Sequence, residues 1–147
     1  MEQRVEAPND SERKWIDANL RVSCSFVKAY DASVEVTGVP PAAALDRAWT
    51  AWLRNWESQP EEDRDDPNPI INAVGIAFGQ HLVNALGLEW AIVTDQHGTE
   101  IAVHGRPGNI IVFPPNLVAK RFERRTDGFV VPLLEKMCTD IRAVWSA

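Results

Sequence analysis

Four side chains that could take part in acid–base or metal chemistry lie close together in the middle of the chain: Glu89, Asp95, Glu100 and His104. Paired carboxylates beside a histidine can transfer protons or hold a metal ion. A hairpin that pairs Asp95 with Glu100 would bring all four to one face of a sheet. Asp95 also suits the first position of a turn, and strand carboxylates often pair with basic side chains such as Arg106. We therefore treat the four as candidate ligand-binding residues and assign no catalytic residue and no metal site.

The one basic cluster of the sequence comprises Lys120, Arg121, Arg124 and Arg125. Arginine binds phosphate or carboxylate groups through two parallel hydrogen bonds, so the cluster could clamp a small anion. Lys120 and Arg121 are the candidate ligand-binding residues here. The alternative is internal pairing with Glu89, Glu100 or the acidic segment 58–68.

Nucleophilic catalysis has little support in the sequence. Cys24, Cys138 and the serines beside Cys24 lie in no nucleophile elbow and precede no triad signature. The spacing of the cysteines fits no metal site, which favours buried reduced thiols. His81 is expected to be a hydrogen-bonded core histidine. No phosphate-cradling glycine loop is present, so no cofactor is expected.

The element expected to organise these residues is a buried helix, Pro69–Leu86. Asn68 is placed as its N-cap, and Gly87 follows its last apolar pair, where a left-handed residue is favoured. The apolar arc is wider than a surface helix needs. Gly75 and Gly79 lie one turn apart, which predicts close packing of another element against the helix.

A three-stranded antiparallel meander is expected to follow, with strands at 88–95, 100–104 and 110–113 and turns between them. Pairing Asp95 with Glu100 sets the alternation of side chains. One face then holds Trp90, Ile92, Ile101, Val103, Ile110 and Val112. The other holds Glu89, Ala91, Val93, Asp95, Glu100, Ala102, His104, Ile111 and Phe113. The second face is neither clearly polar nor clearly apolar, so either a helix covers it or it binds something.

Further helices are expected on both sides of this unit. Residues 1–9 are expected to form a loose tail, and Asp10 or Ser11 to cap a helix that ends near residue 32. A second helix is expected to start at Pro41 and to carry a core stripe of Leu45, Trp49, Trp52 and Trp56. A short helical turn is expected at 116–119, and a C-terminal helix around Pro132 closes the fold.

Size and charge narrow the classes of protein. The chain has 147 residues, of which 45% are apolar, enough for one α+β domain spanning 1–147. Its formal net charge of −6 argues against nucleic acid and anionic membranes as partners. The charged N-terminus has no apolar signal region, so a cytoplasmic location is expected.

Several motifs of the middle segment occur together in a known family. They are Gly75-Ile76-Ala77-Phe78-Gly79 with Leu82, Leu86-Gly87-Leu88-Glu89-Trp90, then Asp95, Gly98, Glu100 and Ala102, and finally Val112-Phe113-Pro114 with Lys120-Arg121. In this pattern the chain resembles a bacterial family known only as a domain of unknown function. The resemblance implies the helix-then-meander arrangement, covers a little over a third of the chain and carries no known activity.

Two classes of function remain open. The leading hypothesis is a non-enzymatic protein-interaction module, immunity- or adaptor-like by analogy, that binds a protein partner or a second copy of itself through the mixed sheet face. The alternative is a small-anion-binding domain or hydrolase that combines this sheet face with the basic cluster. The two differ in whether Glu89, Asp95, Glu100, His104 and the basic cluster meet in one concavity.

Overall fold

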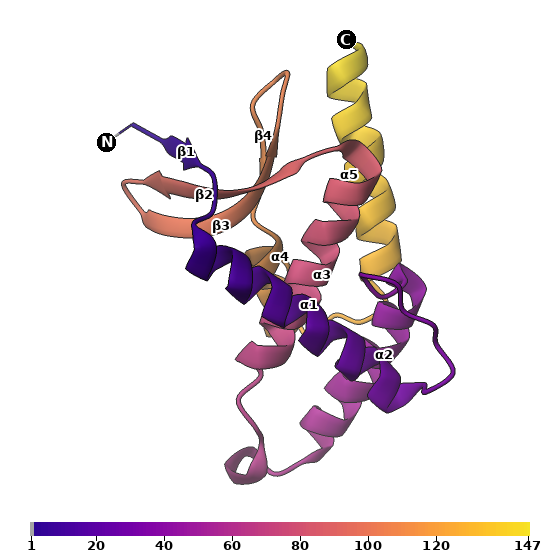
Figure 1. Ribbon diagram of the computed structural model, residues 1–147. Helices are drawn as coiled ribbons and strands as arrows, with labels where there is room; N and C mark the ends of the chain where they lie inside the picture. Colours follow the sequence, from indigo (N-terminus) through magenta and orange to yellow (C-terminus); the bar gives the residue numbers. More distant parts are fainter. Residues whose placement is uncertain (1) are drawn as a thin grey trace.

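The protein folds as helices packed against one antiparallel sheet (Figure 1). The computed structural model describes residues 2–147. Its elements are β1 (Arg4–Glu6), α1 (Asp10–Tyr30), α2 (Ala42–Ser58), the 3-10 turn η1 (Glu61–Asp63), α3 (Asn68–Leu86), β2 (Glu89–Asp95), β3 (Gly98–Gly105), β4 (Ile110–Val112), α4 (Pro114–Glu123) and α5 (Val130–Ser146). The α+β class expected from the sequence is confirmed.

Helix α3 lies at the centre of the fold, as expected. Every residue from Ala73 to Gly79 is buried, so the helix packs on all sides rather than along one stripe. Gly87 ends it in the left-handed region at φ 70°. The expected cap at Asn68 is wrong: the cap position is Pro67, and the Asn68 N–H instead donates to Asp66 Oδ1 at 3.0 Å.

The two glycines of α3 do allow close packing. A Cβ added at Gly75 would lie 2.6 Å from Pro115 Cα, and one at Gly79 would lie 2.8 Å from Pro114 Cγ and would also meet the Trp90 ring. The start of α4 and the side chain of Trp90 therefore occupy the space that these two missing side chains leave.

Among residues 2–147, α3 alone is long and apolar enough to cross a membrane, judged by length and composition. Core helices pass the same test. The uninterrupted burial of residues 73–79 identifies α3 as such a core helix.

The sheet has four strands in the order β1-β2-β3-β4, and all neighbouring strands are antiparallel. The expected meander is present, but its register differs from the expected one. Asp95 pairs with Gly98, and Glu100 pairs with Val93, two residues from the expected partner. Because side chains alternate with a period of two, a shift of two leaves both faces as expected.

The N-terminal segment is not a loose tail, and this expectation was wrong for the described residues 2–9. β1 pairs with β2 in the register Arg4↔Thr94, Val5↔Val93 and Glu6↔Ile92, which makes a fourth strand. α1 then starts in a capping box in which Asn9, and not Asp10 or Ser11, accepts from the Glu12 N–H at 2.8 Å.

The C-terminal half of the fold is tied to the N-terminal half through α5. The two carboxylate oxygens of Asp46 in α2 accept from the backbone N–H groups of Val130 and Val131, at 2.7 and 2.8 Å. This side chain caps the first turn of α5 from another helix. α4, expected as one short turn, spans Pro114–Glu123 because Pro114 and Pro115 fit a first helical turn.

The tryptophan stripe of α2 packs into the core, as expected. Trp49 is fully buried and donates its indole N–H to Thr126 O at 2.9 Å. Trp52 and Trp56 are half-buried and contact the Phe122 ring, Trp52 in a tilted and Trp56 in an edge-to-face arrangement. The main core combines residues from all five α-helices with Val103 and Val112 of the sheet.

The sheet has buried residues on both faces, although the helices lie to one side of it. Trp90, Val103 and Val112 belong to the face that packs on α3, and Trp90 donates its indole N–H to Gln80 Oε1 at 3.0 Å. In Figure 1 the helices lie below and to the right of the strands, and no helix lies above them. The opposite face, which holds Val93, Ala102 and His104, is not open to solvent: Val93 and Ala102 are 2% and 0% exposed.

Candidate functional site

A groove of about 780 Å³ lies beside the start of β2. It lies where the β1–α1 junction, the end of α3 and the ends of β2 and β3 meet. We call this hollow the edge groove. It is lined by Val5, Glu6, Ala7, Arg13, Val83, Gly87, Leu88, Glu89, Trp90, Ala91, His104, Gly105 and Arg106. A volume in this range suits a drug-sized ligand or a few residues of peptide.

One wall of the edge groove is an open strand edge. β2 spans Glu89–Asp95, but β1 pairs only with residues 92–94 before the chain turns into α1. Within residues 2–147, no strand lies beside residues 89–91 on that side. Neighbouring residues of an antiparallel strand direct their N–H and C=O groups to opposite sides. At least one of these three residues therefore presents both groups to the groove.

The four acidic and histidine candidates do not form one site. Glu89 is the cross-strand partner of His104, and both line the edge groove. Glu100 pairs with Val93, four residues from Glu89, which corresponds to about 13 Å along the strand. Asp95 Oδ1 accepts from the His97 N–H at 2.7 Å in the turn. Within the described chain, no three His, Cys, Asp or Glu residues are placed to hold a metal ion.

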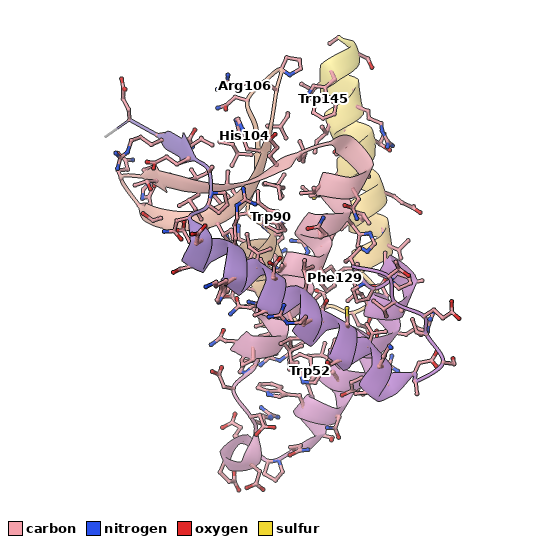
Figure 2. The ribbon with its side chains drawn as sticks, in the orientation of Figure 1. Trp52, Trp90, His104, Arg106, Phe129 and Trp145 are labelled. Carbon is pink, nitrogen blue, oxygen red and sulfur yellow. The ribbon has the colours of Figure 1, made fainter. Side chains whose placement is uncertain are left out.

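His104 is oriented by a neighbour. Its Nε2 lies 2.9 Å from Asn109 Oδ1, which only accepts, so Nε2 carries a proton and donates. In the neutral ring, Nδ1 is then left as an acceptor. Figure 2 shows His104 and Arg106 on the same side of the sheet, beside β4, with Trp90 on the opposite side. This matches their spacing of two residues along one strand direction.

Two arginines of the edge groove were missed as site residues from the sequence. Arg13 comes from α1, and Arg106 follows β3 in the turn to β4. Neither guanidinium forms an ion pair or a side-chain hydrogen bond with any residue of the described range. For Arg106, its place two residues after His104 was a usable signal. For Arg13 there was none, because its distance to the sheet depends on how β1 and α1 fold.

The basic cluster is not part of this groove. Arg125 donates to Phe122 O at 2.7 Å and lies over the Trp56 ring, at 5.0 Å from its centroid. Arg64 stacks on the same ring at 4.6 Å. Neither Lys120 nor Arg121 lines the edge groove. No ion pair joins the cluster to Glu89, Glu100 or the acidic segment in the part of the chain described, so the expected internal pairing is not seen there.

The remaining reactive groups have structural partners. His81 Nε2 lies 2.7 Å from Pro40 O, which fits the expected hydrogen-bonded core histidine. Cys24 and Cys138 are both free thiols, and the Cys24 Sγ–H donates to Gly38 O at 3.4 Å. Burial raises the pKa of the Cys138 thiol, and the nearby charge of Arg142 opposes this in part.

The comparisons with known proteins identify a family and nothing more specific. Residues 52–132, more than half of the 147 residues, match the model of the family described as "Domain of unknown function (DUF3806)". The match covers α3, the three strands β2–β4 and α4, and therefore most of the edge groove. No curated protein and no solved structure matches the chain.

Proposed function

This chain belongs to the DUF3806 family of domains of unknown function, and on that premise we propose that it is a non-enzymatic protein-interaction module. It holds an extended segment of a partner protein in the edge groove, beside residues 89–91 of β2. The observation that carries the proposal is the coincidence of an open strand edge with the edge groove.

An open edge favours a peptide over other ligands. An exposed strand edge presents a row of backbone donors and acceptors that another chain can pair with. Addition of a strand to a sheet edge is a recurring mode of peptide recognition, in which main-chain hydrogen bonds give affinity and side pockets give specificity. In this protein β1 already pairs with residues 92–94 in this way. A partner strand would continue the same row.

The walls of the groove supply the apolar contact that strand addition needs. Val5, Val83 and Leu88 line it together with the Trp90 ring. An added strand directs alternate side chains to opposite faces, so one set would lie on the face of Trp90 and the other on the face that holds Val5, Glu89 and His104. Apolar contact combined with backbone pairing is what makes a short segment bind specifically.

A non-catalytic role is supported by the separation of the candidate groups. Acid–base catalysis needs its groups within hydrogen-bond reach of one reacting atom. In the protein, Asp95 is engaged in the turn, Glu100 is distant from Glu89, and the basic cluster lies outside the groove. The net charge of −6 supports a protein partner over nucleic acid or an anionic membrane, and we extend the proposal to a cytoplasmic protein.

The proposal is tested by filling the groove. Ala7 is exposed and lines it, so Ala7→Trp blocks the site without altering the core. Ala143→Trp on the exposed side of α5 is the matched control. Proteins captured from the native host by wild type and by each variant are quantified by mass spectrometry, and direct binding is measured with the purified candidate. We expect Ala7→Trp to lose the partner and Ala143→Trp to keep it. Equal capture by both variants would place the interaction elsewhere.

A second candidate is a binding site for a small anion in the same groove, which Arg13 and Arg106 favour. It differs from the expected anion clamp because it uses neither Lys120 nor Arg121. A small anion needs no open strand edge, so the peptide remains the leading proposal.

A further inference from the structure

The edge groove holds charges of both signs, and their pairing is unequal. Glu6 lies 3.9 Å from Arg4, and Glu89 lies opposite His104 in the register. Of the two acidic side chains, only Glu6 has an ion-pair partner; Glu89 forms no ion pair or side-chain hydrogen bond among residues 2–147. Arg13 and Arg106 have no partner among residues 2–147. Two arginines and one glutamate of the groove are thus unpaired, which leaves a surplus of one positive charge there, although the protein as a whole carries −6.

The two arginines reach the groove from different elements. Arg13 lies in the second turn of α1, on the side of the β1–α1 junction, and Arg106 lies just beyond the end of β3. A guanidinium binds a carboxylate through two parallel N–H···O bonds. A partner that supplies a carboxylate there would pair charges that the protein itself leaves unpaired.

We propose that the segment bound beside residues 89–91 carries an acidic residue, whose carboxylate Arg13 and Arg106 bind. This inference rests on the proposed function and specifies its partner as an extended, acidic peptide with apolar or hydroxyl side chains at alternate positions. His104 Nδ1, left as an acceptor by the bond to Asn109, receives a donor from the same segment.

The test uses three pools of capped pentapeptides that share Val, Ile or Thr at the flanking positions and differ only at the centre, which is Glu, Gln or Lys. Binding to the full chain is followed through the backbone amide resonances of residues 88–91. We expect the Glu pool to bind about tenfold more tightly than the Gln pool, because charge-assisted hydrogen bonds are roughly twice as strong as neutral ones and a difference of about 1.4 kcal/mol is tenfold in affinity. The Lys pool should bind most weakly.

Matched variants assign the preference to the two arginines. Arg13→Gln and Arg106→Gln should each remove most of the difference between the Glu and Gln pools, whereas Arg124→Gln, an exposed arginine outside the groove, should leave it unchanged. Arg106→Lys keeps the charge without the planar fork and should restore part of it. Amide spectra recorded without peptide show whether each variant is folded.

The outcomes separate this inference from the function on which it rests. Equal binding of the Glu and Gln pools at residues 88–91 overturns the acidic partner and leaves the peptide groove standing, as does a preference for Lys. If no pool shifts these resonances at millimolar concentration, both proposals fail. If acetate alone binds as tightly as the Glu pool, the groove is a small-anion site and the acidic peptide is overturned.

Discussion

At the residue scale, single side chains join parts of the chain that are far apart in sequence. Asp46 is the clearest case, because its carboxylate accepts both of its hydrogen bonds from the first turn of α5. α5 has no capping side chain of its own at Phe129. The stability of the C-terminal helix therefore depends on a residue of α2.

Replacing this cap should destabilise the protein measurably. Asp46→Ala leaves two backbone N–H groups without their acceptor, and we expect the free energy of unfolding to fall by about 1–2 kcal/mol. Asp140→Ala, at an exposed carboxylate paired with Lys136, is the control and should change it by less than about 0.5 kcal/mol. Urea unfolding of both variants provides the measurement. An unchanged midpoint for Asp46→Ala would contradict the role as a cap.

The two thiols should differ in reactivity. The thiolate is the reactive form, and Cys138 is only 8% exposed with a pKa raised by burial. Cys24 is half-buried. We expect iodoacetamide to modify Cys24 at least about tenfold faster than Cys138 at pH 8 in the native protein, and at similar rates in denaturant. Peptide mapping by mass spectrometry measures both. Equal rates in the native state would show that Cys138 is accessible.

The raised pKa of Cys138 makes the stability of the protein depend on pH. A thiol whose pKa is higher in the folded than in the unfolded state binds more protons when folded. Its contribution to stability is therefore complete below the ordinary thiol pKa of about 8.5 and is lost as the pH rises above that value. Cys138→Ser should reduce the loss of stability seen in urea unfolding between pH 8 and pH 10. An unchanged slope would assign that loss to other groups.

Sequence reasoning at this scale identified residue types better than their partners. Trp49 and His81 behave as expected because an apolar stripe and a lone helical histidine are both common core features. Arg13 was missed because nothing in its local sequence distinguishes it from other exposed helical arginines. Only the turn of the chain after β1 brings it to the groove.

At the element scale, the fold depends on how closely other segments approach α3. Gly75 faces the backbone of Pro115, which cannot move without shifting the start of α4. Gly79 faces side-chain atoms of Trp90 and Pro114, which can adjust. A side chain added at Gly75 should therefore be tolerated less well than one added at Gly79.

Gly75→Ala should destabilise the protein although alanine is the better helix former. We expect a loss of about 1–3 kcal/mol from overpacking, against a gain of about 0.5–1 kcal/mol in an open helix. Gly79→Ala should cost less and should change the near-ultraviolet circular dichroism of Trp90. Ala85 is exposed on the same helix, so Ala85→Gly measures the difference in helix propensity between alanine and glycine alone. A neutral or stabilising Gly75→Ala would show that α4 is free to move.

β1 should behave as a separable edge strand. Deleting residues 2–6 removes the strand and keeps the capping box of Asn9, so α1 should remain. We expect amide hydrogen exchange to accelerate at residues 92–94 and to stay unchanged in α5. Unchanged exchange at 92–94 would contradict the pairing of β1 with β2.

The sequence predicted α3 and the three strands of the meander because their signals are local: a long apolar run between a proline and a glycine, and β-branched strands between turns. It missed β1 because three residues, Arg4 to Glu6, carry no alternation long enough to detect, and because their partner lies almost ninety residues away. The error of two residues in register left every side chain assigned to the correct face, because side chains alternate with a period of two residues.

At the scale of the whole molecule, the candidate site forms where several helices and strands meet, and not at a sequence motif. The family match at residues 52–132 covers the strand edge and Arg106 but not β1 or Arg13, so part of the groove wall lies outside the matched segment. The convergence of these elements could not be predicted from the sequence, because it depends on where a short, weakly patterned N-terminal strand pairs.

The central claim is that the open edge of β2 pairs with a segment of another protein. Amide hydrogen exchange of the protein, alone and with the partner captured through the groove, tests it most directly. The account predicts new protection within residues 88–91 and none at 120–125. Protection confined to 120–125, or to α1 beyond Arg13, with residues 88–91 unchanged, would contradict it.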